Sequence, residues 1–133
     1  MSSSAKFPKY RTPLHQAKGW GSAKSGTGHF WWQRVTAVIL ALLVPYIVFL
    51  LASATGHDAA GLRAMLAQPW NAIVFTVFSI ALFWHAKLGM QVVIEDYVHD
   101  RAIHLALRIL LILGSLVGVL SAIYAIARIA MTA

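Results

Sequence analysis

One predicted membrane helix carries an unusual set of side chains that can do chemistry. Residues 84–100, WHAKLGMQVVIEDYVHD, end one of the most apolar stretches of the chain and contain His85, Lys87, Asp96 and Tyr97. Ionisable side chains inside a bilayer are costly, so those that are present are candidates for function. The chemistry open to them depends on how a helix would arrange them.

Helical geometry separates these residues by face and by depth. Each residue advances about 100°, so positions seven or eleven apart return to within about 20° of each other. His85, Val92 and Asp96 therefore share one face, with Gly89 one turn from His85 and Lys87 on the opposite side. At about 1.5 Å per residue, His85 lies roughly 16 Å before Asp96, well inside the hydrocarbon layer.

Three roles are open to His85 at this depth. It can be a packing residue hydrogen-bonded to a neighbouring helix, or part of a proton relay. Its neutral imidazole can also be an axial ligand to haem iron, with Gly89 leaving room for the flat macrocycle. No other histidine of the chain is expected at this depth, so a bis-histidine haem would need its second ligand from another chain.

Asp96 and Tyr97 are expected where the helix reaches the membrane surface. A carboxylate and an aromatic ring are ordinary at such a helix end. The functional alternative is a tyrosine hydroxyl that donates to a carbonyl oxygen, with the carboxylate tuning it or relaying protons. A lipophilic quinone would sit at this depth, and both interpretations remain open from the residues alone. On the opposite face, Lys87 is expected to need a polar partner on another helix or an ordered water.

The composition indicates a single-domain membrane protein. Of 133 residues, 59% are hydrophobic and 11% are charged, against roughly 25% charged in soluble domains. The chain contains no cysteine, which excludes a disulfide, an iron–sulfur ligand or a thiolate nucleophile from its own residues.

The apolar stretches predict an all-α fold with three transmembrane helices. Uncharged runs at 35–56, 64–84 and 109–127 meet the length of about 20 residues that a membrane helix needs. We expect spans at about 32–56, 69–94 and 102–128, with a kink at Pro45 and a loop around residues 57–63. Residues 1–30 would form a basic arm and 31–133 the membrane domain. Gly114, Gly118 and Ser121 repeat at the spacing that permits close helix contact.

The distribution of charge predicts the orientation. The net charge is +7, and the first 34 residues hold six basic residues and no acid. Basic segments next to a span favour the inner side, so we expect the N-terminus inside and the C-terminus outside, with no nucleic-acid partner. The start is too long and polar for a cleaved secretion signal, although an acid-poor basic start also suits an organelle transit peptide.

The motif on the second helix resembles a known family. The pattern His85-Ala-x-x-Gly89-x-x-Val92-x-x-x-Asp96-Tyr97 is similar to the signature of the small membrane-anchor subunit of succinate dehydrogenase, respiratory complex II. Upstream, the stretches GHF at 28–30 and RVTA at 34–37 are similar to the entry of that family into its first helix. The likeness covers the chain from about residue 26 onward.

The resemblance implies a function shared with other subunits. In this family the anchor packs with a second cytochrome b membrane-anchor subunit, and the two bind one haem b with an axial histidine from each chain. They also hold the flavoprotein and iron–sulfur subunits on the inner side of the membrane, where electrons from succinate reach ubiquinone. The anchor is therefore part of an enzyme but is not catalytic alone. The bacterial inner (cytoplasmic) membrane is expected, in preference to the mitochondrial inner membrane.

The resemblance also assigns roles to residues. It implies that His85 is the haem iron ligand, that Tyr97 donates a hydrogen bond to the quinone, and that Asp96 supports Tyr97. Arg34 enters the membrane on the same side as Tyr97 and would pair either with a haem propionate or with lipid phosphate. For the basic residues at the inner end of the third span, contact with membrane lipid is the simplest role.

Two other functions remain open from the sequence. One is a non-catalytic packing or assembly subunit of another membrane complex, which would leave His85 as a packing residue. The other is the anchor of a related fumarate reductase, because the direction of the reaction depends on cofactors in other chains.

Overall fold

The computed structural model describes residues 26–132, which form three long helices and one short helix. In chain order these are α2 (Gly26–Ser53), α3 (Ala59–Ala67), α4 (Pro69–Tyr97) and α5 (Arg101–Thr132). All secondary structure in the described part is helical, so the all-α prediction is confirmed. Residues 1–25, which make up most of the predicted basic arm, lie outside the described residues.

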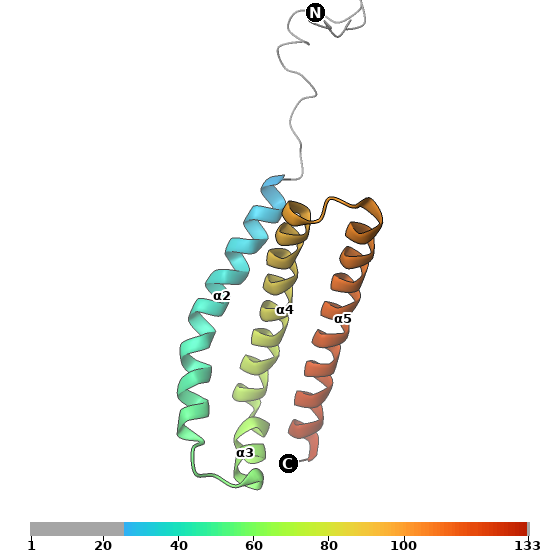
Figure 1. Cartoon of the computed structure of the whole chain (residues 1–133). Coiled ribbons are helices and arrows are strands. Elements are labelled where there is room, and N and C mark those ends of the chain that lie inside the picture. The colour runs from blue at the N-terminus through green and yellow to red at the C-terminus, as the bar shows by residue number, and fades with distance from the viewer. Residues whose placement is uncertain (1–25, 133) are drawn as a thin grey trace, which may run out of the picture.

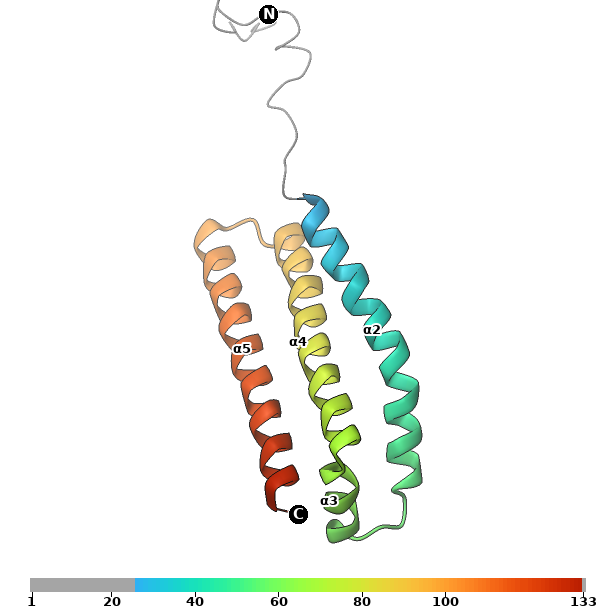
Figure 2. The same ribbon diagram turned by 180° about the vertical axis from the view of Figure 1, so that it is seen from behind.

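The long helices lie side by side, with α4 between α2 and α5 (Figures 1 and 2). All three are long and apolar enough to cross a membrane. They contain 28, 29 and 32 residues, or about 42–48 Å at 1.5 Å per residue, which exceeds a hydrocarbon layer of about 30 Å. The helix ends therefore reach beyond that layer on at least one side.

The chain alternates direction through the bundle. The start of α2, the end of α4 and the start of α5 lie at one end, whereas α3 and the C-terminal end of α5 lie at the other (Figures 1 and 2).

Helix α2 continues through Pro45. Helix α4 begins with Pro69, a residue that suits the first helical turn because it has no N–H to leave unpaired. Asp96 and Tyr97 belong to the last turn of α4.

A short helix replaces the loop predicted around residues 57–63. Gly56 turns the chain after α2 with a φ of +94°. Asp58 then caps α3, because its side chain accepts a hydrogen bond of 2.8 Å from the backbone N–H of Gly61. At nine residues, α3 is too short for hydrophobic periodicity to reveal it.

Most of the buried residues lie on the central helix. Helix α4 buries five residues, Asn71, Val74, Ala81, Leu88 and Ile94, while α5 buries none. Large apolar side chains are exposed along α5, including Leu110, Leu113, Val117 and Leu120. In a membrane such side chains face lipid or another subunit at little cost, because lipid tails are as apolar as leucine.

A buried hydrogen-bond network ties three helices together at the α3 end. The Tyr46 hydroxyl on α2 donates to Asn71 Oδ1 on α4 over 2.9 Å, and Asn71 Nδ2 donates to the carbonyl of Met65 on α3 over 2.7 Å. Asn71 is 4% exposed. Since a buried amide needs partners, this network fixes how α2 and α3 meet the start of α4.

Candidate functional site

His85 is held against α2 by a hydroxyl group. Its Nδ1 atom lies 3.0 Å from Oγ1 of Thr36, a hydrogen-bond distance between two residues that are 49 positions apart in sequence. Thr36 is 5% exposed and His85 is half-buried. The imidazole therefore has a hydrogen-bonding neighbour on α2.

Thr36 also bonds to its own helix. Its hydroxyl lies 2.8 Å from the carbonyl oxygen of Trp32 and 3.2 Å from that of Gln33. Serine and threonine inside helices commonly donate to a carbonyl three or four residues earlier. The sequence pattern places Thr36 at the entry to the first span but assigns it no role.

A polar stripe on α2 leads from the start of the helix to Thr36. His29, Gln33 and Thr36 follow one another at spacings of four and three residues, the repeat of one helical face. His29 Nε2 and Gln33 Oε1 are buried, and neither has a hydrogen-bond partner among the described residues. Gln33 was missed from the sequence, although its spacing from Thr36 was a usable signal.

Gly89 lies opposite this stripe. A methyl group built on Gly89 would stand 3.6 Å from Gln33 Nε2, which is an ordinary contact distance. Packing among residues 26–132 therefore does not require glycine at this position.

Asp96 and Tyr97 lie at the end of α4, away from His85. Tyr97 is 79% exposed and Asp96 is also exposed. Among residues 26–132, no hydrogen bond engages the carboxylate of Asp96 or the hydroxyl of Tyr97. Twelve helical residues separate Tyr97 from His85, or about 18 Å along the axis, so the two residues belong to different levels of the bundle.

Arg34 lies near the level of His85. It precedes Thr36 by two residues, about 3 Å along the axis of α2. Its side chain is exposed, and its guanidinium carbon stands 4.9 Å from the centre of the Phe30 ring. Arg34 and Tyr97 therefore lie toward the same end of the bundle, as expected, but at different depths. Arg34 lies closer in depth to His85 than to Tyr97.

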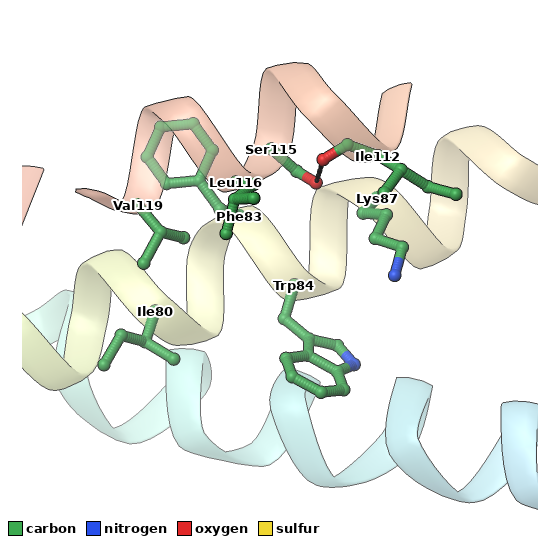
Figure 3. A pocket seen from close by; sticks show the side chains of 8 residues that line it. All are labelled: Ile80, Phe83, Trp84, Lys87, Ile112, Ser115, Leu116 and Val119. Carbon is green, nitrogen blue, oxygen red and sulfur yellow. Dashed lines mark hydrogen bonds between the residues drawn. The ribbon is translucent and has the colours of Figure 1, made fainter. Parts of the chain in front are cut away.

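Lys87 faces the space between α4 and α5. It borders a cavity of about 330 Å³ together with Ile80, Phe83, Trp84, Ile112, Ser115, Leu116 and Val119 (Figure 3). Its Nζ atom lies 5.7 Å from the centre of the Trp84 ring, a cation–π distance. Ser115 donates to the carbonyl of Ile112 over 2.9 Å. Within the described part of the chain, Lys87 therefore contacts an aromatic ring on its own helix and hydrogen-bonds to no polar side chain of another helix, while the alternative expectation of an ordered water stays a prediction.

The described residues contain no cluster of three or more histidine, cysteine, aspartate or glutamate side chains that could hold a metal ion. The described residues alone therefore do not make up the full ligand set of a metal ion at His85.

Comparison with known proteins identifies the family. The three long apolar helices are those of a multi-pass membrane protein, and a hydrogen bond between Thr36 and His85 joins two of them. Residues 8–125 match the family described as succinate dehydrogenase/fumarate reductase transmembrane subunit. The chain belongs to this family, as a small hydrophobic membrane anchor of succinate dehydrogenase.

Individual relatives agree with this assignment. The chain is 34% identical over 125 residues to the succinate dehydrogenase hydrophobic membrane anchor subunit of Paracoccus denitrificans, covering 94% of this chain and 96% of the relative. It is 35% identical to the protein of the same name from Rickettsia bellii, covering 88% and 94%. The succinate dehydrogenase membrane anchor subunit of Reclinomonas americana is 38% identical over a shorter stretch, 57% of this chain and 66% of the relative. The family resemblance seen in the sequence is confirmed.

Proposed function

We propose that His85 supplies one axial ligand of a b-type haem shared with a second membrane-anchor subunit. The observation that carries this proposal is the state of the imidazole. Its Nδ1 atom is engaged by Thr36, and no described residue hydrogen-bonds its Nε2 atom. A half-buried histidine with one nitrogen held and the other available suits a metal ligand, since imidazoles that bind metals usually use their second nitrogen in such a bond.

The surroundings of His85 fit a haem better than a bare ion. The lack of a ligand cluster in the described part excludes an ordinary metal site built from these residues alone. A haem supplies four of its iron ligands itself and would act as a one-electron carrier. Arg34 lies at about the same depth with an exposed guanidinium, and we assign it to a haem propionate. The second axial ligand would come from the partner subunit.

We further propose that Tyr97 and Asp96 form part of a ubiquinone-reduction site. Both side chains are exposed at the end of α4 and bond to no described residue, so the hydroxyl is free to donate to a quinone carbonyl. The bundle places them at the end where α2 starts (Figure 1). With the N-terminus inside, this end faces the flavoprotein and iron–sulfur subunits that the anchor would tether to the inner membrane.

The haem assignment is tested by replacing His85 with Ala in the purified complex. We expect the b-type absorption band to be lost or shifted, because no other described histidine lies at this depth. His104→Ala is the matched control, since His104 is a second half-buried histidine on a membrane helix, near the start of α5. An unchanged spectrum and midpoint potential in His85→Ala would refute the ligand role.

A further inference from the structure

We propose that Thr36 is a positioning residue for His85, which fixes the imidazole as the Nδ1–H tautomer and so leaves the lone pair on Nε2. This inference rests on the proposed role of His85 as a haem ligand. It adds a residue of the first membrane helix, to which the family resemblance assigns no role, to the motif on the second helix. Three observations support it: the partners of the hydroxyl, its burial and its distance from the ring.

The first observation is the number of hydrogens that Thr36 can donate. A hydroxyl has one hydrogen and two acceptor lone pairs. The short distance of 2.8 Å to the Trp32 carbonyl, with 3.2 Å to that of Gln33, places this single hydrogen on the backbone of α2. The oxygen can then serve His85 only as an acceptor. The hydrogen between Thr36 Oγ1 and His85 Nδ1 therefore belongs to the imidazole.

Burial strengthens this assignment. Thr36 is 5% exposed, so water has little access to replace either bond. If Nδ1 carried no hydrogen, its lone pair would face a hydroxyl oxygen at 3.0 Å unless the hydroxyl gave up its carbonyl partner. Two lone pairs that face each other at that distance repel, because neither atom then donates a hydrogen. The Nδ1–H tautomer is consequently the favoured neutral form.

The tautomer decides which chemistry His85 can perform. A neutral imidazole with hydrogen on Nδ1 presents its only ring lone pair at Nε2, as a metal ligand requires. A proton relay through Thr36 would first have to break the bond between the hydroxyl and the carbonyl of its own helix. The arrangement therefore favours metal binding by His85 Nε2 over proton transfer between His85 and Thr36.

The strength of the bond predicts an effect on the iron. An acceptor at Nδ1–H raises the basicity of the ligating nitrogen, which favours ferric over ferrous iron. Removing that acceptor should raise the midpoint potential of the haem. Loss of a partner that orients a metal-binding histidine typically weakens metal retention by about 10–100-fold, so haem retention should fall in the same range.

The experiment compares Thr36→Val and Thr36→Ser in the purified complex. Valine keeps the shape of the side chain but removes the acceptor, whereas serine keeps the hydroxyl. We expect Thr36→Val to show a raised haem midpoint potential and faster haem loss on dilution in detergent, and Thr36→Ser to remain close to the unaltered complex. Should Thr36→Val fail to accumulate, Thr36→Ala is measured in the same way, because alanine removes the acceptor without a methyl group against the ring.

The matched control is Thr76→Val. Thr76 also donates to a carbonyl of its own helix, that of Ala72 over 2.7 Å, but it hydrogen-bonds to no described histidine. Loss of a helix hydroxyl alone should therefore leave the haem potential unchanged. A haem potential and retention in Thr36→Val equal to those of the control would overturn the role of Thr36. A haem unaffected by His85→Ala would instead overturn the ligand assignment on which it rests.

Discussion

The ring of Phe83 on α4 fills the space beside Gly118 on α5 that a side chain would otherwise occupy. A methyl group built on Gly118 would overlap three atoms of the Phe83 ring. The ring projects from α4 toward α5 beside the cavity that Lys87 borders (Figure 3). This contact lets α4 and α5 approach closely, and it explains why one of the two glycines in the small-residue stripe must lack a side chain.

We expect Gly118→Ala to destabilise the packing of α5 on α4. The added methyl forces the Phe83 ring or the helices to move, and overpacking of this kind costs about 1–3 kcal/mol. The apparent melting temperature of the purified complex measures the effect. Combining Gly118→Ala with Phe83→Leu should restore part of the stability, because leucine offers a smaller obstacle at the contact.

Gly114→Ala provides the control. A methyl group on Gly114 would meet nothing within 4 Å in the described part of this chain, and alanine favours helix more than glycine by about 1 kcal/mol. Its melting temperature should not fall. A larger loss of stability in Gly114→Ala than in Gly118→Ala would contradict the assignment of the close contact to Gly118.

The small-residue stripe shows what sequence spacing can and cannot predict. The repeat of Gly114 and Gly118 predicted close packing on one face, yet of these two only Gly118 is so close to a described residue that an added methyl group would meet it. Spacing identifies a face, but the partner side chain decides which position of that face is crowded. The three spans were predictable for a simpler reason, because length and apolar composition alone separate them from the connecting segments.

The polar contacts between helices were not predictable in the same way. His85 stood out because an ionisable residue in a membrane span is rare, whereas threonine in a helix is common, and the likeness of RVTA at 34–37 gave no role to Thr36. The pairing of Tyr46 with Asn71 was likewise missed, since uncharged polar residues of this kind do not stand out in an apolar span. Such pairs depend on how neighbouring helices are aligned along their axes, and the hydrophobic periodicity of the sequence does not reveal this alignment.

The orientation is tested by reporter fusions at Met1 and Ala133. The basic arm predicts an inside N-terminus, and three crossings then place the C-terminus outside. A reporter that is active only outside should therefore work at Ala133 and fail at Met1. If both reporters were found on the same side of the membrane, the chain could not cross it three times. That result would also contradict the proposal that Tyr97 lies on the side of the membrane where the catalytic subunits bind.

The last prediction concerns the hydroxyl of Tyr97. Replacing Tyr97 with Phe keeps the ring and removes one hydrogen-bond donor, which is worth about 0.5–1.5 kcal/mol for a neutral partner and more when the acceptor gains negative charge. Since about 1.36 kcal/mol corresponds to a tenfold change in rate, quinone reduction should fall by about tenfold or more. Succinate oxidation with an artificial acceptor that takes electrons from the hydrophilic subunits should stay nearly constant, and so should the haem spectrum.

Tyr124→Phe is the control, because Tyr124 is 67% exposed but lies toward the other end of the bundle, where no loss of quinone reduction is expected. Full quinone activity in Tyr97→Phe would leave the hydroxyl without a role in catalysis, and equal loss of both activities would identify Tyr97 as a residue needed for assembly.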